Sequence, residues 1–543
     1  MIKLSWSQIS FTYDQKTWLG GKEIWVNWLL RLVLLVLTGV SIYYFISFYT
    51  NGLGLAYNDA RSHLDIGRRV VEGLKPGLAQ LGSVWLPLPH LLMVPTIWND
   101  FMWHSGLAGA LQSMISFVAT GVIVYLFLQE LGVGILGRLM GVVVFAANLN
   151  ILYLQSTAMT ELLLLATMMA GIYELVKWCK TDQILFLIRG AFWVMLATLI
   201  RYEGWFLLLV ASSLVFYRTW RQQNYHTAEG KVILFGTLAA FGIALWFLWN
   251  ALIFKDPFYF VFGPFSAAAQ QAQLARAGVL VTKGNFWFSL KIYLYALIYN
   301  AGAFTAILGA IGLAVLFWDR KLKRDVRWAA AVFLVTPLVF NVLALYLGHS
   351  VLFIQGLSGN TWFNVRYGVM MLPSIAIFTG FLVDRVRSLR WLVIGLFLFV
   401  TVFAFANHDA VTIDDARVGS SQKNVSEVSD WLKEHAKNET GFVLISAASH
   451  DAIIFSSGLP MKRFIHEGTG AYWESATTTP DRWARWIVMR TYDDNDLTWK
   501  TVSRTPGFAS YTLVAKYPFA DVYEIQPEYV KQLNTAPILG KQK

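Results

Sequence analysis

Runs of about twenty apolar residues recur along the chain, and this repetition constrains the fold more than any other feature of the sequence. A helix of that length crosses the hydrocarbon core of a bilayer, because each residue adds about 1.5 Å along the axis. The chain has 543 residues, of which 56% are hydrophobic and only 14% are charged, a balance that excludes a soluble protein of this size. We therefore predict a polytopic α-helical membrane protein with about eleven transmembrane helices. The expected spans are 29–49, 106–128, 135–155, 161–178, 184–200, 204–217, 232–254, 290–317, 328–347, 367–383 and 391–407.

The net charge of +11 indicates topology rather than a nucleic-acid partner, because the basic residues lie in short clusters between apolar runs. These clusters fall in alternate loops, which the positive-inside rule assigns to the cytoplasm together with the N-terminus. They comprise Lys177 with Lys180, Arg218 with Arg221, and the stretches 319–327 and 385–390. The first outer loop is then 50–104 and a second long outer loop is 255–289.

The sequence turns polar after the last span. Residues 408–543 contain an amphipathic segment at 425–436 and four short strand-like segments at 441–446, 485–489, 510–517 and 520–525. We expect a membrane domain over 1–407 and a small extracytoplasmic α/β domain over 408–543.

Conspicuous polar residues gather at the outer ends of the predicted spans, where the positive-inside rule should deplete arginine. The stretch "YNDARSHLDIGRR" at 57–69 opens the first outer loop. Ionisable groups at membrane depth are costly and usually face a cavity or a pathway. We therefore predict one outward-facing polar cavity built from Asp59, His63, Asp65, Glu161, Arg201, Glu203, His349 and Arg366. Tyr367, next to Arg366, is a further candidate for substrate binding.

This arrangement resembles the GT-C superfamily of polyprenyl-phosphate-sugar glycosyltransferases, and most closely the family 39-like group of protein mannosyltransferases and aminoarabinose transferases. The shared features are a long first outer loop with an aspartate soon after span one, many further spans, short basic inner loops and an outer C-terminal domain. The resemblance implies an inverting membrane glycosyltransferase acting on the outer face of the cell membrane. Its donor would be a polyprenyl-phosphate-linked sugar, and its acceptor a lipid, glycan or protein.

In that superfamily the first outer loop carries a catalytic acidic residue, which corresponds here to Asp59 in "NDARSHLD". Asp59 would be the base that takes the acceptor proton, and Arg201, His349 and Arg366 would hold the phosphate. His63 lies four residues after Asp59 and would share its helix face. The superfamily's tight acidic pair is replaced by a distant Asp65.

Metal dependence is therefore open. A divalent cation, Mg²⁺ or Mn²⁺, would take Asp59 and Glu161 as ligands.

Each residue also has a structural interpretation. Asp59 is suited to cap a loop helix, and Glu161 either to cap the next span through Thr160 or to complement its N-terminal dipole. Arg201 and Glu203 are close enough to form a local ion pair.

The remaining charged and aromatic positions have structural interpretations as well. Asp65, Arg68 and Arg69 are expected on a solvated or headgroup-facing side. Tyr367 suits the aromatic belt, and His349 alone does not make a metal site.

Three further segments bear on the substrate. Residues 82–98 are apolar but contain three prolines, which favours an interfacial stretch that could guide a polyprenyl tail. Loop 255–289 would either close over the donor or rest on the bilayer as an amphipathic helix. Residues 445–473 of the outer domain would help to position the acceptor.

Two other functions fit the same composition. A lipid or small-solute transporter or flippase also places polar groups in a membrane cavity, although the sequence has no paired inverted halves. A noncatalytic scaffold with a polymer-binding outer domain is the third interpretation.

Overall fold

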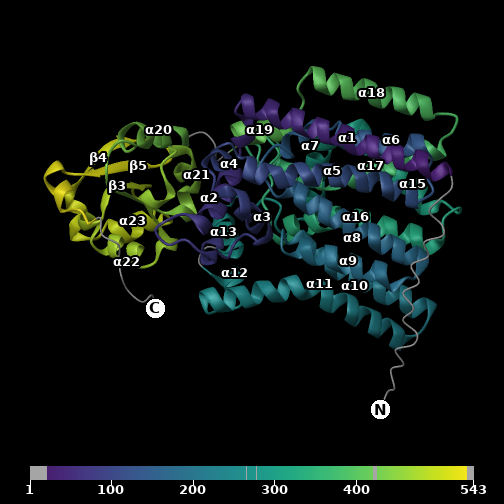
Figure 1. Ribbon diagram of the computed structural model, residues 1–543, viewed down its shortest axis with the longest axis horizontal. Helices are drawn as coiled ribbons and strands as arrows, with labels where there is room; N and C mark the ends of the chain where they lie inside the picture. Colours follow the sequence, from purple (N-terminus) through teal and green to yellow (C-terminus); the bar gives the residue numbers. More distant parts are fainter. Residues whose placement is uncertain (1–20, 264–265, 277, 420–424, 535–543) are drawn as a thin grey trace, which may run out of the picture.

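The computed structural model describes residues 21–263, 266–276, 278–419 and 425–534 of the chain. A bundle of long helices occupies one part of the molecule, and a smaller domain with a β-sheet packs against one end of that bundle (Figure 1). The helices of the bundle and its loops are α1 (Gly21–Thr50), α2 (Asn58–Val71), α3 (Leu88–Ile97), α4 (Asp100–His104), α5 (Leu107–Glu130), α6 (Ile135–Ala146), α7 (Leu149–Leu154), α8 (Glu161–Thr181), α9 (Ile184–Thr198), α10 (Glu203–Gln222), α11 (Tyr225–Phe254), α12 (Tyr259–Phe262), α13 (Ala267–Arg276), α14 (Phe286–Ala301), α15 (Ala303–Trp318), α16 (Arg324–Leu347), α17 (Leu372–Arg385), α18 (Arg390–Ala406) and α19 (Val411–Val418). A 3₁₀ segment, η5 (Val365–Met371), leads directly into α17.

The described residues contain seven helices that are long and apolar enough to cross a membrane, or eight spans if a bent pair is counted as one. The prediction of a polytopic helical membrane protein is thus confirmed, whereas the count of eleven spans is not. The predicted span 135–155 divides into α6 and α7, because Asn148 caps a new helix by accepting a hydrogen bond from the Ile151 N–H. Helix α9 is shorter than a full span, and α10 is not among the seven.

The predicted span 290–317 is a bent pair of helices, α14 and α15, whose axes differ by 110°. Gly302 lies at the bend with a φ of 78°, a conformation that glycine adopts without steric cost. The Asn148 and Asn150 side chains donate to the carbonyl oxygen of Asn300 at 2.7 and 3.1 Å. The carbonyl exposed by the bend is therefore satisfied within the protein.

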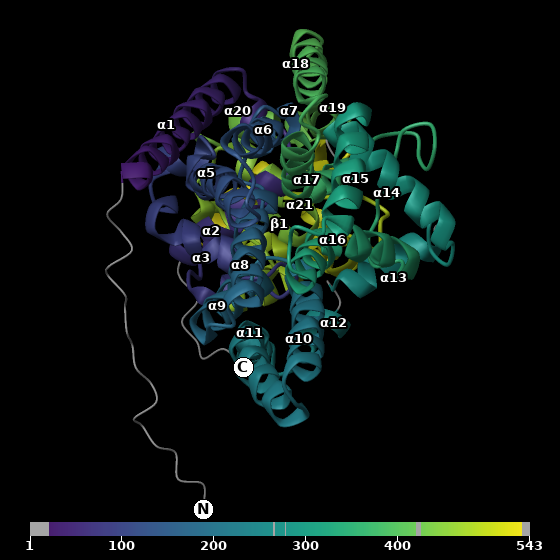
Figure 2. The same ribbon diagram turned by 90° about the vertical axis from the view of Figure 1, so that its right-hand side faces the viewer.

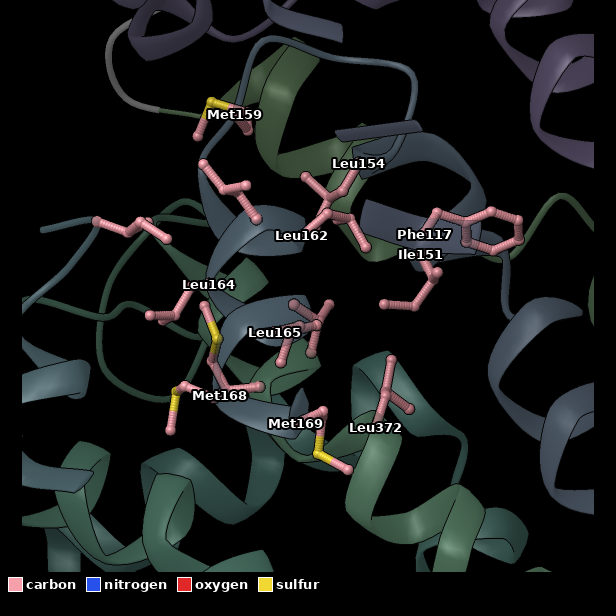
Figure 3. Packing of buried hydrophobic residues seen from close by; sticks show 14 of the residues in the cluster. Phe117, Ile151, Leu154, Met159, Leu162, Leu164, Leu165, Met168, Met169 and Leu372 are labelled. Atoms are coloured by element: carbon pink, nitrogen blue, oxygen red, sulfur yellow. The ribbon is translucent and has the colours of Figure 1, made fainter. Parts of the chain in front are cut away.

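Helix α8 forms the centre of the bundle and is buried along most of its length. Figure 3 shows its apolar side chains meeting side chains of α5, α7 and α17. The labelled residues are Leu162, Leu164, Leu165, Met168 and Met169 of α8 with Phe117, Ile151, Leu154 and Leu372. Because α8 is packed on all sides, its first residue, Glu161, is held in a fixed and water-excluded position.

The C-terminal domain contains a five-stranded sheet in the order β2-β1-β3-β5-β4. Strand β1 runs parallel to β2 and β3, whereas β5 runs antiparallel to both β3 and β4. The strands are β1 (Phe442–Ile445), β2 (Phe464–Ile465), β3 (Ala484–Met489), β4 (Tyr511–Lys516) and β5 (Asp521–Ile525), and the helices are α20 (Val425–His435), α21 (Ala447–Ser457), α22 (Ala471–Thr478) and α23 (Leu497–Val502). The predicted helix and all four predicted strands are present, whereas the two-residue β2 and the helices α21, α22 and α23 were not predicted.

The first loop, with α2, α3 and α4, lies between the bundle and the C-terminal domain (Figure 1). The apolar stretch at 82–98 contributes the short helix α3 rather than a span, as its prolines predicted. Helix α18 stands apart from the other helices in both views (Figure 2), and most of its side chains are exposed.

Candidate active site

Four segments that are distant in sequence meet at the end of the bundle that faces the C-terminal domain. Asp59 lies in the first turn of α2, and Glu161 begins α8. Arg201 lies in the turn between α9 and α10, and Arg366 lies on η5. The predicted basic loops are at the other end, because Lys180 is in the last turn of α8. The structure thus brings together Asp59, Glu161, Arg201 and Arg366, which the sequence analysis placed at one side of the membrane.

Arg366 links two of the carboxylates. Its Nη2 donates to Asp59 Oδ2 at 2.6 Å, and its Nε donates to Glu161 Oε1 at 3.1 Å. Gly368 makes this position possible, because a Cβ there would collide with the carbonyl of Ala296 in α14. Asn364, with a φ of 53°, turns the chain into η5 and donates to the Val351 carbonyl.

Arg201 extends the same network. Its Nη1 donates to Glu161 Oε1 at 3.2 Å, and its Nη2 donates to Glu203 Oε1 at 2.9 Å. Burial lowers the pKa of Arg201, but the neighbouring Glu203 and Glu161 carboxylates outweigh it and raise that pKa above its usual value. The local ion pair predicted for Arg201 and Glu203 is present, and it is one part of a larger cluster. Tyr367 packs its ring against both guanidiniums, 5.1 Å from Arg201 and 5.5 Å from Arg366.

Two cluster residues were missed in the sequence. Tyr57 donates from its hydroxyl to Asp415 Oδ2 at 3.1 Å and to the Thr412 carbonyl at 2.9 Å. Asp415 lies on α19 and comes within 4.0 Å of Arg366 Nη1. Tyr57 is two residues before Asp59, so its position in the sequence could have indicated that it belongs to the cluster. Nothing in "VTIDDARV" distinguishes Asp415 from the polar tail to which the segment was assigned.

Solvent access separates the carboxylates of the cluster. The Asp59 side chain is 43% exposed, whereas the side chains of Glu161, Glu203 and Asp415 are at most 6% exposed. Asp59 is therefore the carboxylate that a substrate can reach, and the others hold the guanidiniums in place.

Helix capping does not account for Asp59 or Glu161. Tyr57 occupies the N-cap of α2, and Thr160 makes no capping hydrogen bond from its side chain at the start of α8. Glu161 does lie in the first turn of α8, where its charge complements the helix dipole.

His63 lies behind this cluster and makes no hydrogen bond with Asp59 in the described part of the chain. Its Nδ1 is 2.9 Å from Nε2 of the buried His90, and its ring packs against Trp85. Burial, with smaller contributions from Arg201 and Arg366, lowers the pKa of His63 to about 3, so the ring is neutral. His349 is exposed just after α16, and among the described residues it has no hydrogen bond or ion pair with the cluster.

The expectation that Asp65, Arg68 and Arg69 face solvent or headgroups is wrong. Each is less than 10% exposed. Arg69 donates to Asp451 of α21 at 2.7 Å, and Trp103 donates to Asp65 at 3.0 Å. The C-terminal domain covers this part of α2, which sequence could not indicate.

Arg68 is buried for a different reason. It donates to the carbonyls of Ile97 and Trp98 and to Asp100, and its guanidinium lies 4.6 Å from the centre of the Trp103 ring. These bonds fix the end of α2 to α3 and α4.

A cavity of about 590 Å³ opens beside Asp59, between the first loop and the C-terminal domain. Helix α2 contributes Asp59, Ser62 and Arg69 to its wall, and α21 contributes Ser449, His450 and Asp451. Tyr259 and Gln270, from the long loop 255–289, also line it. Residues 264–265 and 277 of that loop lie outside the described residues.

A divalent cation does not fit the residues as they are arranged. Arg366 binds both Asp59 and Glu161, so the two proposed metal ligands already share a cation. Among the described residues, no three His, Cys, Asp or Glu side chains are grouped as a metal site.

Comparisons with known proteins identify the fold. No protein-family model matches the chain, and no curated protein matches it by sequence. The apo structure of ArnT from Cupriavidus metallidurans matches with a TM-score of 0.54 and 14% identity, covering 94% of this chain and 99% of ArnT. ArnT bound to undecaprenyl phosphate matches with a TM-score of 0.54 and 12% identity, covering 90% and 98%. The chain therefore has the same fold as ArnT.

Proposed function

We propose that this protein is an inverting membrane glycosyltransferase that moves a sugar from a polyprenyl-phosphate donor to an acceptor on the outer face of the membrane. The observation that carries the proposal is Asp59, a partly exposed carboxylate that borders the cavity and is bound to Arg366. The GT-C fold, and undecaprenyl phosphate bound to a protein of that fold, support a lipid-phosphate donor.

The chemistry is a single displacement. The acceptor oxygen attacks the anomeric carbon, the bond from that carbon to the phosphate oxygen breaks, and the polyprenyl phosphate leaves with the electron pair. The acceptor proton passes to the carboxylate of Asp59, the general base. Attack opposite the leaving group inverts the configuration of the sugar.

Arg366 couples the two ends of this step. While Asp59 is ionised, it occupies the Nη2 donor of Arg366 at 2.6 Å. Once Asp59 accepts the proton it loses its charge, and the guanidinium is then released to stabilise the phosphate that is leaving. Glu161 keeps Arg366 in position throughout, because it also binds Nε.

Transfer by the full-length protein in liposomes tests the proposal, with a panel of radiolabelled polyprenyl-phosphate sugars as donors. We expect the wild type to consume at least one donor and Asp59→Asn to lose that activity. Asp100→Asn is the matched control, since Asp100 is also a first-loop carboxylate paired with an arginine, but it does not line the cavity. Donor consumption by Asp59→Asn at the wild-type rate would refute the assignment of the base.

Adding a chelator to the same assay tests whether transfer requires a divalent cation. Turnover that survives chelation supports charge stabilisation by the guanidiniums. Turnover that is lost and restored by Mg²⁺ or Mn²⁺ would mean that a cation displaces Arg366 from Asp59 and Glu161.

The bent helix pair α14 and α15 is the one observation that favours a transporter, because broken helices line many transport sites. The carbonyl at the bend is bound by two asparagine side chains, so it is not open to a substrate. Movement of labelled lipid across the liposome membrane without donor consumption would favour transport over transfer.

A further inference from the structure

The cavity beside Asp59 has a second wall made by the C-terminal domain, and one side chain in that wall has an unused hydrogen-bonding atom. His450 of α21 is 1% exposed and lines the cavity. Its Nε2 lies 2.6 Å from Asp496 Oδ2, whereas its Nδ1 is buried without a hydrogen-bond partner in the described residues. A buried polar atom without a partner is costly, so its presence in a cavity wall points to a ligand.

Asp496 requires Nε2 of His450 to carry a proton. Its two oxygens also accept from the backbone N–H groups of Arg490, Thr498 and Trp499. Burial opposes ionisation of Asp496, but these bonds and the bond from His450 lower its pKa below the usual range. An ionised carboxylate only accepts hydrogen bonds, so His450 Nε2 donates to it, and Nδ1 is the ring nitrogen that is left to bind a ligand. A hydroxyl group suits Nδ1, because a hydroxyl can both donate and accept a hydrogen bond.

The rest of the cavity lining matches a saccharide better than a lipid tail. Trp85, Tyr259 and Phe363 provide aromatic rings, and Ser62, Gln80 and Ser449 provide hydroxyl or amide groups. The face of an aromatic ring carries a partial negative charge and attracts the C–H groups of a sugar ring, while the polar groups form hydrogen bonds with its hydroxyls.

A second cavity of the molecule shows the contrast. The groove of about 430 Å³ between α1, α6 and α7 is lined almost entirely by aliphatic side chains such as Leu32, Val36 and Val142, which suits an acyl or polyprenyl chain.

We infer that the cavity between the two domains binds a saccharide acceptor, and that His450 Nδ1 forms a hydrogen bond with one of its hydroxyl groups. This inference rests on the proposed function, because it assigns to the cavity the acceptor that Asp59 would deprotonate. His450 is a positioning residue: it orients the acceptor from the domain side while Asp59 acts from the membrane side.

Binding of free saccharides tests this inference without requiring turnover. The probes are linear and branched gluco-, manno- and galacto-oligosaccharides, from disaccharides to hexasaccharides, titrated into the full-length protein in nanodiscs and followed by saturation-transfer NMR. We expect at least one to bind the wild type and His450→Gln to weaken it about tenfold, the loss of one hydrogen bond of about 1.4 kcal/mol. The glutamine amide can still donate to Asp496 in place of Nε2, whereas nothing replaces Nδ1.

Two further variants protect the test. His435→Gln, at an exposed histidine of the same domain that does not line the cavity, should bind like the wild type. Ala448→Trp fills the cavity without altering the His450–Asp496 pair and should also weaken saccharide binding. This second variant keeps the inference testable if His450→Gln does not fold. Melting temperatures of all variants identify any that are unfolded.

Equal saccharide affinity in His450→Gln and the wild type would overturn the inference, as would the absence of binding by every saccharide in the panel. Asp59→Asn should retain saccharide binding while losing transfer. If saccharides bind in a His450-dependent way but no donor is consumed, the proposed function fails and the saccharide site stands. If donors are consumed but no saccharide binds, the saccharide site fails and the proposed function stands.

Discussion

Helix α2 carries two clusters of arginine and carboxylate side chains that use the same chemistry in different surroundings. Near its start, Asp59 binds Arg366 and is 43% exposed to the cavity. Nearer its end, Arg69 binds Asp451 of the C-terminal domain, and both side chains are only 10% exposed. The difference teaches that solvent access, rather than residue type, separates a carboxylate that a ligand can reach from one that joins two domains.

The largest expected effect contrasts Asp59 with Asp65. Removal of a general base lowers turnover by about 10²- to 10⁴-fold, so Asp59→Asn should lose transfer to that extent. Asp65 lies on the same helix, but it hydrogen bonds to Trp103 and Asp451 rather than to a substrate. Asp65→Asn should therefore keep a transfer rate within about tenfold of the wild type. Single-turnover transfer rates in liposomes measure both. Equal losses in the two variants would remove the functional distinction between the clusters.

Glu161 should matter most for stability within the first cluster. It is fully buried, and its Oε1 accepts from both Arg201 and Arg366. Breaking a buried pair by removing one partner costs about 3–5 kcal/mol, so Glu161→Ala should strongly lower the melting temperature in detergent. Glu130→Ala, at a partly exposed glutamate paired with Lys180, is the control and should cost less than about 1 kcal/mol.

Arg69 should have a smaller effect that is confined to the domain interface. Arg69→Met leaves Asp451 without its cation, at a cost of about 1–3 kcal/mol. The cost is limited because Asp451 can still hydrogen bond to Asp65. Hydrogen exchange should rise in α21 and stay unchanged in α8. Faster exchange in both helices would mean that the interface supports the whole bundle.

The same interface should respond to pH. Burial raises the pKa of Asp451 to about 6, and it raises the pKa of Asp65 well above its ordinary range. A carboxyl whose folded-state pKa is raised contributes stability that is complete below the unfolded value of about 4 and is lost as pH rises through the folded value. Docking of the domain should therefore strengthen as pH falls from about 7 to about 5.

Protection of α21 against hydrogen exchange, measured after correction for the intrinsic rate, reports this change. Asp65→Asn should flatten this pH dependence, since it removes one of the two neighbouring carboxyl groups. An interface that weakens on acidification would contradict the assignment.

The smallest effect is expected at Asp100, whose side chain is 77% exposed although it binds Arg68. An exposed ion pair contributes at most about 1 kcal/mol, so Asp100→Asn should change the melting temperature little. High salt should erase any difference that remains.

The sequence by itself determined the class of the protein. The apolar runs predicted a polytopic helical fold, because the bilayer allows few alternatives for satisfying the backbone. The excess of charge at one end of the spans predicted that Asp59, Glu161, Arg201 and Arg366 would meet. The alternating patterns of the tail predicted four of the five strands.

Only the tertiary structure decided which charges are reachable and which are buried. Asp65 and Arg69 were predicted to lie on a solvated helix face, because the sequence of α2 gives no sign of the domain that covers it. Asp451, the partner of Arg69 in that domain, is 382 residues further along the chain. Asp415 and His450 likewise acquire their neighbours only through the packing of α19 and α21. Burial depends on contacts between segments remote in sequence, whereas hydropathy and periodicity are properties of a single segment.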